Sequence, residues 1–150
     1  MPSSWTQNYY HMVFGTHRRE PWIGPELKER LYPFFGGIAK DLRSQLIAGN
    51  GMPDHVHLLI RFAADVAPAV LAREAKARSS RWIHETFPGM REFAWQRGYG
   101  GFTVSRSVVP EVEEYIRRQE EHHRRTTFED EFPMLLTKHG IAFNPEYLFD

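Results

Sequence analysis

The chain has 150 residues, of which 41% are hydrophobic and 14% aromatic, and its formal net charge is zero. This length suits one domain, residues 1–150, and no apolar run approaches the roughly 18 residues that cross a membrane. The lack of cysteine excludes disulfides, thiolate metal sites and cysteine nucleophiles, so chemistry must use histidine, tyrosine, carboxylates or a metal bound by nitrogen and oxygen. The lack of cysteine also fits an intracellular setting, and since the first residues carry no secretory signal we expect a soluble protein with no membrane partner.

The predicted elements begin with a strand at residues 8–14, which are aromatic and apolar. A helix is expected over residues 24–42, where apolar side chains recur at helical spacing, although Pro33 would kink it. Two short apolar runs then surround Asn50-Gly51, a strong hairpin signal that predicts two adjacent strands.

The second half repeats the alternation of helix and strand. Residues 68–87 predict a basic amphipathic helix, and residues 93–107 predict two short strands around Gly-Tyr-Gly-Gly. Ser107 can cap a helix over residues 108–125, and a last short helix is expected at 128–138. The order β-α-β-β-α-β predicts an α+β, ferredoxin-like sandwich: an antiparallel sheet with helices on one face, plus a C-terminal helix that carries a tyrosine.

Two histidines lie one residue apart in the strand that follows the hairpin signal. Residues i and i+2 of a strand share a face, so His55 and His57 stand about 6 to 7 Å apart at their Cα atoms and can chelate one cation. The intervening hydrophobic residues form the opposite face, which leaves the histidines on the face expected to be free of helices. Asp54 could orient an imidazole. Hydrogen-bonded structural histidines are the alternative.

A second motif lies on the helix predicted for residues 108–125. Tyr115, Gln119 and His122 are spaced i, i+4, i+7 and therefore share a stripe. A tyrosine phenolate attacks phosphorus well once a metal neutralises the charge, and the resulting ester conserves the bond energy for rejoining. The alternative is an amphipathic tyrosine at the edge of the core.

Together these motifs make the chain resemble the HUH-type single-strand DNA transposases of the insertion-sequence-200 kind, in particular the REP-associated tyrosine transposases. The resemblance runs from about residue 5 to residue 149. It rests on five blocks in order: "HMVFGTHRREPWI", "GMPDHVHLLI", "WQRGYGGFTVSRS", "VEEYIRRQEEHH" and "TTFEDEFPMLLTKHGI".

The resemblance implies a role for each matching position. His55, His57 and Gln119 would bind a divalent metal, Mg²⁺ or Mn²⁺, and Tyr115 would attack single-stranded DNA to leave a 5′-phosphotyrosine and a free 3′-hydroxyl. It also implies a hairpin in the DNA, a homodimer in which the tyrosine acts in cis or in trans, and a place in the bacterial cytoplasm with the nucleoid. Imidazoles ordinarily favour other metals than Mg²⁺, so phosphate oxygens would have to complete the site, and metal binding without DNA would be weak.

A DNA-binding surface is expected within residues 71–106, which hold seven Lys or Arg and three Glu, a local net charge of +4. The candidate phosphate contacts are Lys76, Arg78, Arg81, Arg91, Arg97 and Arg106, and the candidate stacking platforms are Trp82, Trp95 and Tyr99. The alternative for the two tryptophans is a place in the core. Of the other histidines, His122 and His123 could assist near the site, and no role is assigned to His11, His17, His84 and His139.

Two other functions would fit the same elements. A ferredoxin-like sheet can hold single-stranded DNA or RNA on aromatic side chains without chemistry. A metal-dependent hydrolase would use water where the transposase uses Tyr115.

Overall fold

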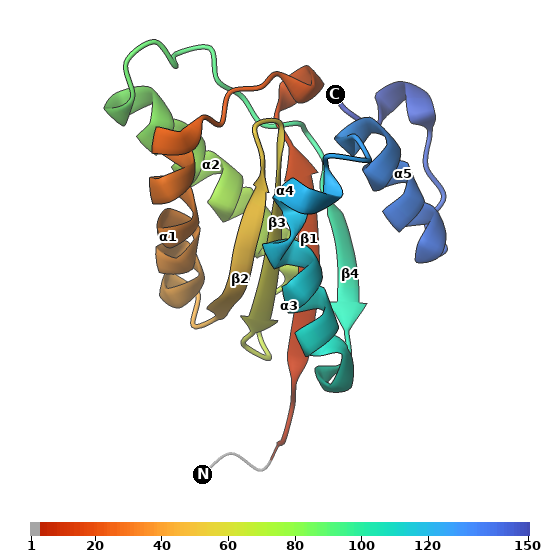
Figure 1. The fold of residues 1–150 in the computed structure, drawn as a ribbon. Coiled ribbons are helices and arrows are strands. Elements are labelled where there is room, and N and C mark those ends of the chain that lie inside the picture. The colour runs from red at the N-terminus through yellow and green to blue at the C-terminus, as the bar shows by residue number, and fades with distance from the viewer. Residues whose placement is uncertain (1–3) are drawn as a thin grey trace.

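The computed structural model describes residues 4–150 (Figure 1). Its main elements are β1 (Asn8–Gly15), α1 (Pro25–Asp41), β2 (Gln45–Met52), β3 (His55–Phe62), α2 (Pro68–Thr86), β4 (Gly100–Val104), α3 (Val109–Arg117), α4 (Gln119–His122) and α5 (Phe128–Lys138). Short 3₁₀ turns lie at His17–Arg19, Arg106–Val108 and Pro145–Tyr147. Within residues 4–150, none of the helices is long and apolar enough to cross a membrane.

The four strands form one antiparallel sheet in the order β2-β3-β1-β4. This order, with two helical connections, is the ferredoxin-like topology predicted from the sequence. α1 and α2 pack on one face (Figure 1), where Phe14 of β1 and Leu58 of β3 join Leu31, Phe35 and Leu71 of the helices in the main core.

The other face of the sheet is covered by α3, α4 and α5 (Figure 1), so the expectation that this face is free of helices is wrong. Val13 of β1 packs with Phe128 and Phe132 of α5, whereas Leu59 of β3 packs with Ile116 of α3. Since side chains alternate along a strand, these residues turn away from the α1 and α2 side and need a second apolar cover. The histidines of β3 are therefore buried.

The hairpin turn lies three residues later than the sequence predicts. Asn50 and Gly51 belong to β2 and pair with His57 and Val56, and Pro53-Asp54 makes the turn. Gly51 does not have a positive φ, so it is not the turn residue. It permits close approach instead, because a Cβ there would lie 2.1 Å from the backbone oxygen of His55.

Two further predictions about the second half are wrong. Residues 93–107 contribute one strand, β4, and Trp95 forms only an isolated bridge with Thr16. The helix expected over 108–125 is divided at Arg118, whose φ of −92° and ψ of 23° leave the helical range, and Ser107 makes no side-chain cap. Asn50 stabilises the break, since its Nδ2 donates to the carbonyls of Ile116 and Arg117 at 3.0 and 3.1 Å.

The surroundings of Gly51 and Gly37 predict opposite effects on stability when each glycine is replaced by alanine. Gly51→Ala should lower the free energy of unfolding by about 1–3 kcal/mol, because the new Cβ collides with backbone that cannot move independently. Gly37→Ala, in the exposed middle of α1 with nothing within 4 Å of its Cβ, should raise it by about 0.5–1 kcal/mol. Urea unfolding measures both, and equal effects would contradict the packing described for Gly51.

Candidate metal centre

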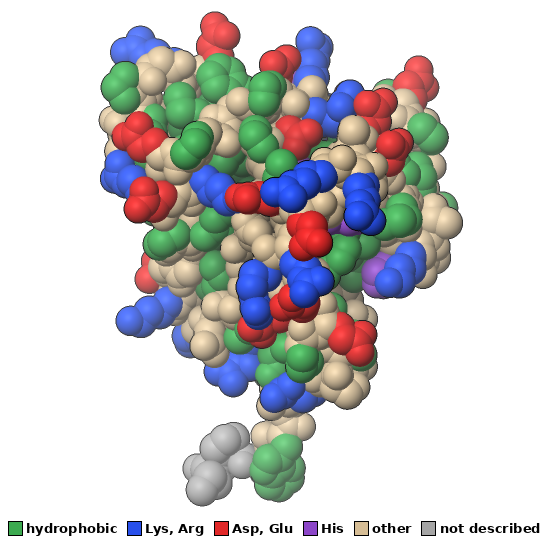
Figure 2. Space-filling model, viewed as in Figure 1, with side chains coloured by type: hydrophobic (Ala, Val, Ile, Leu, Met, Phe, Trp, Pro, Cys, Tyr) green, Lys and Arg blue, Asp and Glu red, His purple; other side chains and the backbone are tan. Residues whose placement is uncertain are grey.

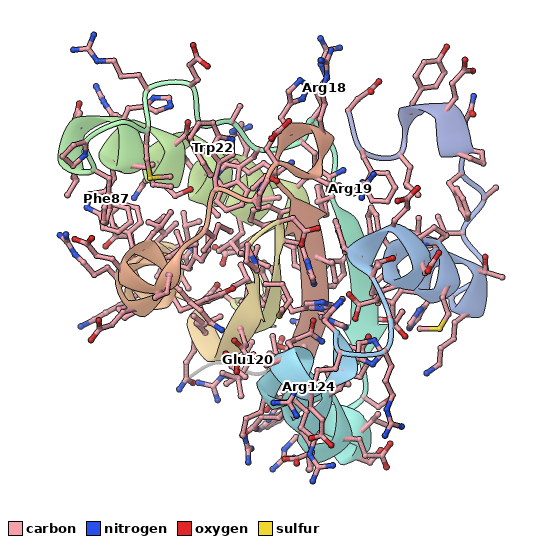
Figure 3. All side chains as sticks on the ribbon, turned by 45° about the horizontal axis from the view of Figure 1, so that its top comes forward. Arg18, Arg19, Trp22, Phe87, Glu120 and Arg124 are labelled. Carbon is pink, nitrogen blue, oxygen red and sulfur yellow. The ribbon has the colours of Figure 1, made fainter. Side chains whose placement is uncertain are left out.

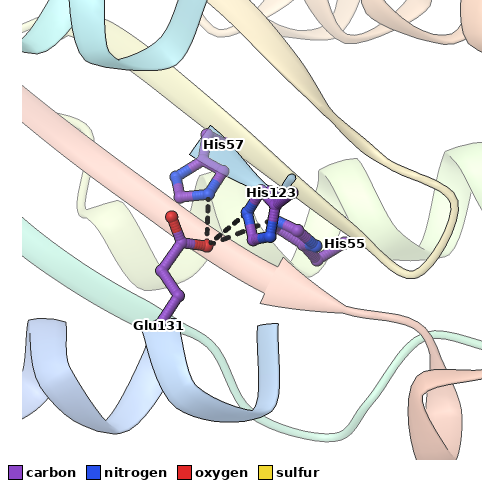
Figure 4. Close-up of side chains that lie close together, drawn as sticks. All are labelled: His55, His57, His123 and Glu131. Atoms are coloured by element: carbon purple, nitrogen blue, oxygen red, sulfur yellow. Dashed lines mark hydrogen bonds and ion pairs between the residues drawn. The ribbon is translucent and has the colours of Figure 1, made fainter. Parts of the chain in front are cut away.

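Three imidazoles and one carboxylate converge on the covered face of the sheet. Nε2 of His55, His57 and His123 lies 3.3, 3.2 and 3.0 Å from the same oxygen, Oε1 of Glu131 (Figure 4). The ligand atoms of these four residues lie within 4.8 Å of one another. His55, His57 and Glu131 have no exposed surface. We call these four residues the histidine-carboxylate cluster.

The two histidines of β3 are held in orientation from behind. The Nδ1 of His55 lies 2.8 Å from Oδ1 of Asp54, and the Phe128 ring stacks on the His55 ring at 4.1 Å, so its Nε2 faces the cluster. The Nδ1 of His57 lies 2.9 Å from Nε2 of His11. His11, which received no role from the sequence, thus contacts the site directly.

Gln119 joins the cluster from α4. Its side chain is fully buried, and its Oε1 lies 3.2 Å from Nε2 of His55 and 2.9 Å from Nε2 of His123. Of the two histidines with which the resemblance grouped it, Gln119 contacts His55, and its second contact is His123.

Tyr115 of α3 lies at the border of the same cluster. Its hydroxyl donates to Oε2 of Glu131, the carboxylate oxygen that does not face His55, His57 and His123. His122 also approaches that oxygen, with its Nε2 at 3.2 Å, and lies 3.5 Å from the tyrosine hydroxyl. Tyr115 is therefore in direct contact with the histidine-carboxylate cluster of its own chain.

The electrostatics follow from burial and from shared hydrogen bonds. Burial raises the pKa of Glu131, but hydrogen bonds from His123, His55 and His57 outweigh it and hold this pKa far below its usual range. Burial lowers the pKa of His57 to about 4. For His55 the penalty of burial is exceeded by its carboxylate partners Asp54 and Glu131, and its pKa is raised.

The pKa of Tyr115 is shifted in the direction opposite to the one that would favour a nucleophile. Burial, and then the hydrogen bond to the carboxylate of Glu131, raise the pKa of the Tyr115 hydroxyl. The phenol is therefore protonated at neutral pH, and positive charge brought close to it would favour the phenolate.

The donor set fits a divalent cation. It offers three imidazole nitrogens, one carboxylate oxygen and one amide oxygen. Adjacent ligands of an octahedral ion with bonds of about 2.1 Å stand about 3 Å apart. The distances from Oε1 of Glu131 to the three nitrogens, 3.0 to 3.3 Å, match this spacing.

The sequence did not identify Glu131 and gave His123 only an assisting role. A signal for Glu131 was present, because it lies three residues after Phe128 and four before Leu135, on the apolar stripe of α5. A carboxylate on a buried stripe needs a partner.

A groove of about 430 Å³ opens beside Tyr115 and His11. Phe102 and His139, whose rings stack at 4.2 Å, line it together with Lys138. Aromatic side chains and a lysine are groups on which proteins can stack bases and bind phosphate.

The expected DNA-binding residues of α2 lie across the sheet from the cluster. Lys76 donates to the carbonyls of Gln96, Arg97 and Gly98, and burial lowers its pKa to about 8. The remaining candidates are arranged as follows: Arg78 pairs with Asp41 and Glu74, Arg81 pairs with Glu85, Arg91, Arg97 and Arg106 are exposed, and Tyr99 is half-buried.

Trp82 and Trp95 are packing residues, which is the alternative to stacking on DNA that the sequence left open. Trp95 is buried and donates to Ser79 Oγ at 2.9 Å, and Trp82 stacks on Phe34 at 4.3 Å.

Charges of both signs alternate on the surface over α3 and α4 (Figure 2). Glu120 and Arg124 lie at this surface over α4 (Figure 3). No broad basic face appears in that view.

A ferredoxin-like sheet that places two histidines of one strand beside a tyrosine is what the resemblance in the sequence leads us to expect. The family model of IS200-like transposases matches residues 4–119, and the chain belongs to this family. It is thus a transposase, an enzyme that cuts and transfers DNA.

Individual relatives agree with this assignment. The ISDra2 transposase TnpA of Deinococcus radiodurans is 26% identical over 115 residues, which cover 73% of this chain and 82% of the relative. A crystal structure of a protein assigned as a transposase, from Deinococcus radiodurans R1, has a TM-score of 0.66 at 24% identity and covers 79% of this chain and 95% of its own. A REP-associated tyrosine transposase bound to a REP hairpin has a TM-score of 0.61 at 14% identity, covering 82% of this chain and 73% of its own. At these identities the two structures establish the fold.

The contacts of Lys76 predict a structural cost when it is replaced. Lys76→Met should lower the free energy of unfolding by about 1–3 kcal/mol, because three carbonyls lose a charged donor. Arg81→Met, which breaks only an exposed pair with Glu85, should change it by less than about 0.5 kcal/mol. Thermal unfolding compares the two, and equal stability would argue that Lys76 is free for DNA.

Proposed function

We propose that this transposase cleaves and rejoins single-stranded DNA through a 5′-phosphotyrosine at Tyr115, with a divalent cation, Mg²⁺ or Mn²⁺, held by His55, His57 and Gln119. One observation carries the proposal. The hydroxyl of Tyr115 donates to the same carboxylate, Glu131, toward which the imidazoles converge. The nucleophile and the candidate cation site therefore share one centre within one chain.

In the forward step the Tyr115 oxygen bonds to phosphorus, and the bond from phosphorus to the 3′ oxygen breaks. The hydroxyl, which is hydrogen-bonded to Oε2 of Glu131, gives up one proton to water, because the low pKa of Glu131 makes that carboxylate a weak base, and the departing 3′ oxygen takes up one proton. DNA remains joined to Tyr115 through its 5′ phosphate. Attack by a 3′-hydroxyl reverses the step and needs no external energy source, because one phosphoester replaces another.

The cation, when bound, would act as a Lewis acid on the scissile phosphate and offset the raised pKa of Tyr115. The residues of the chain supply position: β3 presents two imidazoles, α4 presents Gln119, and α3 holds the tyrosine beside them. Such preorganisation is what a reaction between fixed groups requires.

The substrate class follows from the site and its relatives. The neighbour bound to a REP hairpin supports single-stranded DNA with a hairpin as the substrate of this chain too. The groove beside Tyr115 would take a nucleotide next to the scissile phosphate, with Lys138 for phosphate and Phe102 for stacking. Arg106, in the turn just before α3, is the proposed phosphate contact on this side of the sheet.

The short distance between Tyr115 and its own cluster supports action in cis. The homodimer and the association with the nucleoid, both implied by the resemblance, stay predictions that light scattering and cell fractionation would test.

Tyr115→Phe should abolish covalent attachment to DNA and leave DNA binding intact, because it removes one oxygen from a half-buried ring. The measurement uses 5′- and 3′-labelled hairpin oligonucleotides with randomised single-stranded flanks, incubated with Mn²⁺ and resolved on a denaturing gel. Tyr99→Phe is the control and should form the adduct at the wild-type level.

The same gel separates the competing functions. A DNA- or RNA-binding module would neither cut nor attach, and a hydrolase would cut without attachment. An adduct that persists in Tyr115→Phe would assign the nucleophile to another residue.

Removal of metal should stop the reaction but not the binding of the hairpin. EDTA is expected to suppress the adduct to background, and added Mn²⁺ should restore it, since charge on the phosphate must be offset before an anion can attack it. An EDTA-insensitive adduct would contradict the role given to the His55 and His57 pair.

A further inference from the structure

The cluster contains two side chains that lie beyond the segment matched by the family model, which ends at residue 119. We infer that His123 and Glu131 are additional ligands of the cation, so that this chain binds its metal ion firmly without DNA. The inference rests on the proposed function in one respect, namely that the centre holds a divalent cation.

Geometry is the first argument. Oε1 of Glu131 is the common neighbour of three imidazole nitrogens that come from two separate parts of the chain, His55 and His57 from β3 and His123 from the turn after α4. All four ligand atoms fit within 4.8 Å, as the ligands of one ion must. Gln119 Oε1 touches two of the same nitrogens and belongs to the same set.

Charge is the second argument. A fully buried carboxylate is costly unless opposite charge compensates it. Within residues 4–150 the ion-pair partners of Glu131 are His55, His57, His122 and His123, and none is Lys or Arg. Histidines offer compensation only when protonated, whereas a bound divalent cation carries its charge at every pH. A divalent cation would supply the permanent positive charge that this carboxylate lacks.

Rigidity is the third argument, because a ligand side chain must be held in place. Thr127 caps α5 by accepting from the backbone N–H of Asp130, and Phe128 stacks on His55 one turn before Glu131. Phe132 and Phe128 pack in one hydrophobic cluster with Val13 of β1. α5 thus presents Glu131 to the centre from a fixed helix, and its backbone needs no rearrangement to do so.

The added ligands change the expected metal chemistry. Two imidazoles and an amide make a weak, open site, whereas a carboxylate adds the negative oxygen that Mg²⁺ and Mn²⁺ prefer. Three histidines, Gln119 and Glu131 would together fill about five of six octahedral positions and leave one for a phosphate oxygen. The sequence-based expectation of weak binding without DNA would then be reversed.

The test titrates DNA-free protein with MnCl₂ and follows free Mn²⁺ by electron paramagnetic resonance. Glu131→Gln and His123→Ala should each weaken Mn²⁺ binding by at least about tenfold. Asp130→Asn is the matched control, since it removes the same charge from an exposed position in the same turn, and its affinity should stay within about twofold of wild type. Circular dichroism checks that each variant is folded.

A second measurement uses the wild-type chain and so does not depend on a variant's folding. Electron spin-echo modulation of bound Mn²⁺ should report three coupled imidazole nitrogens; two would remove His123 from the ligand set. Unchanged Mn²⁺ affinity in Glu131→Gln, or no binding to DNA-free wild type, would overturn the inference. The proposed function is tested separately by the Tyr115 adduct, which would form in either case if that function holds.

Discussion

The alternation of side chains along β3, between two covered faces of one sheet, is the constraint on which the site depends. Val56 and Leu58 enter the core under α1 and α2, so His55 and His57 must turn to the other side. Neighbouring strands on both sides fix this register, with His57 opposite Val13 of β1 and Asn50 of β2. A slip of one residue would turn the imidazoles into the apolar core under α1 and α2 and turn Val56 and Leu58 toward Glu131, so the register that packs the core also builds the site.

The break after α3 connects this sheet to the tyrosine. Asn50, opposite His57 in β2, donates to the carbonyls at the end of α3 and so ties the tyrosine helix to the strand beside the histidines. After the break at Arg118, Gln119 at the start of α4 contacts Nε2 of His123, which follows α4 and lies 3.0 Å from Oε1 of Glu131. His122 is directed to the other oxygen of that carboxylate.

Most of the fold could be predicted because helices and strands follow from the local periodicity of apolar residues. Part of the site could not, because its side chains come from elements that are distant in the sequence and meet only in the folded chain. The histidine pair lies within one strand, the spacing of Tyr115 and Gln119 was read on one predicted helix that the structure divides at Arg118, and the resemblance joined the two motifs. Glu131 belongs to a different element and is recognised only when α5 docks on the sheet. The hairpin turn was misplaced because glycine has two uses, positive φ in a turn and close backbone approach, and Gly51 serves the second.

The burial of the centre bears on the choice between rejoining and hydrolysis that the proposed function requires. A phosphotyrosine is useful only if a 3′-hydroxyl reaches it before water does. The cluster has almost no exposed surface, and the half-buried Tyr115 lines the groove together with Phe102 and His139. Bound DNA in that groove would displace water from the side of Tyr115 that faces it, so a 3′ end held there would compete at high effective concentration. On this argument the second cover of the sheet, which hides the histidines, is also what favours strand transfer over simple cleavage.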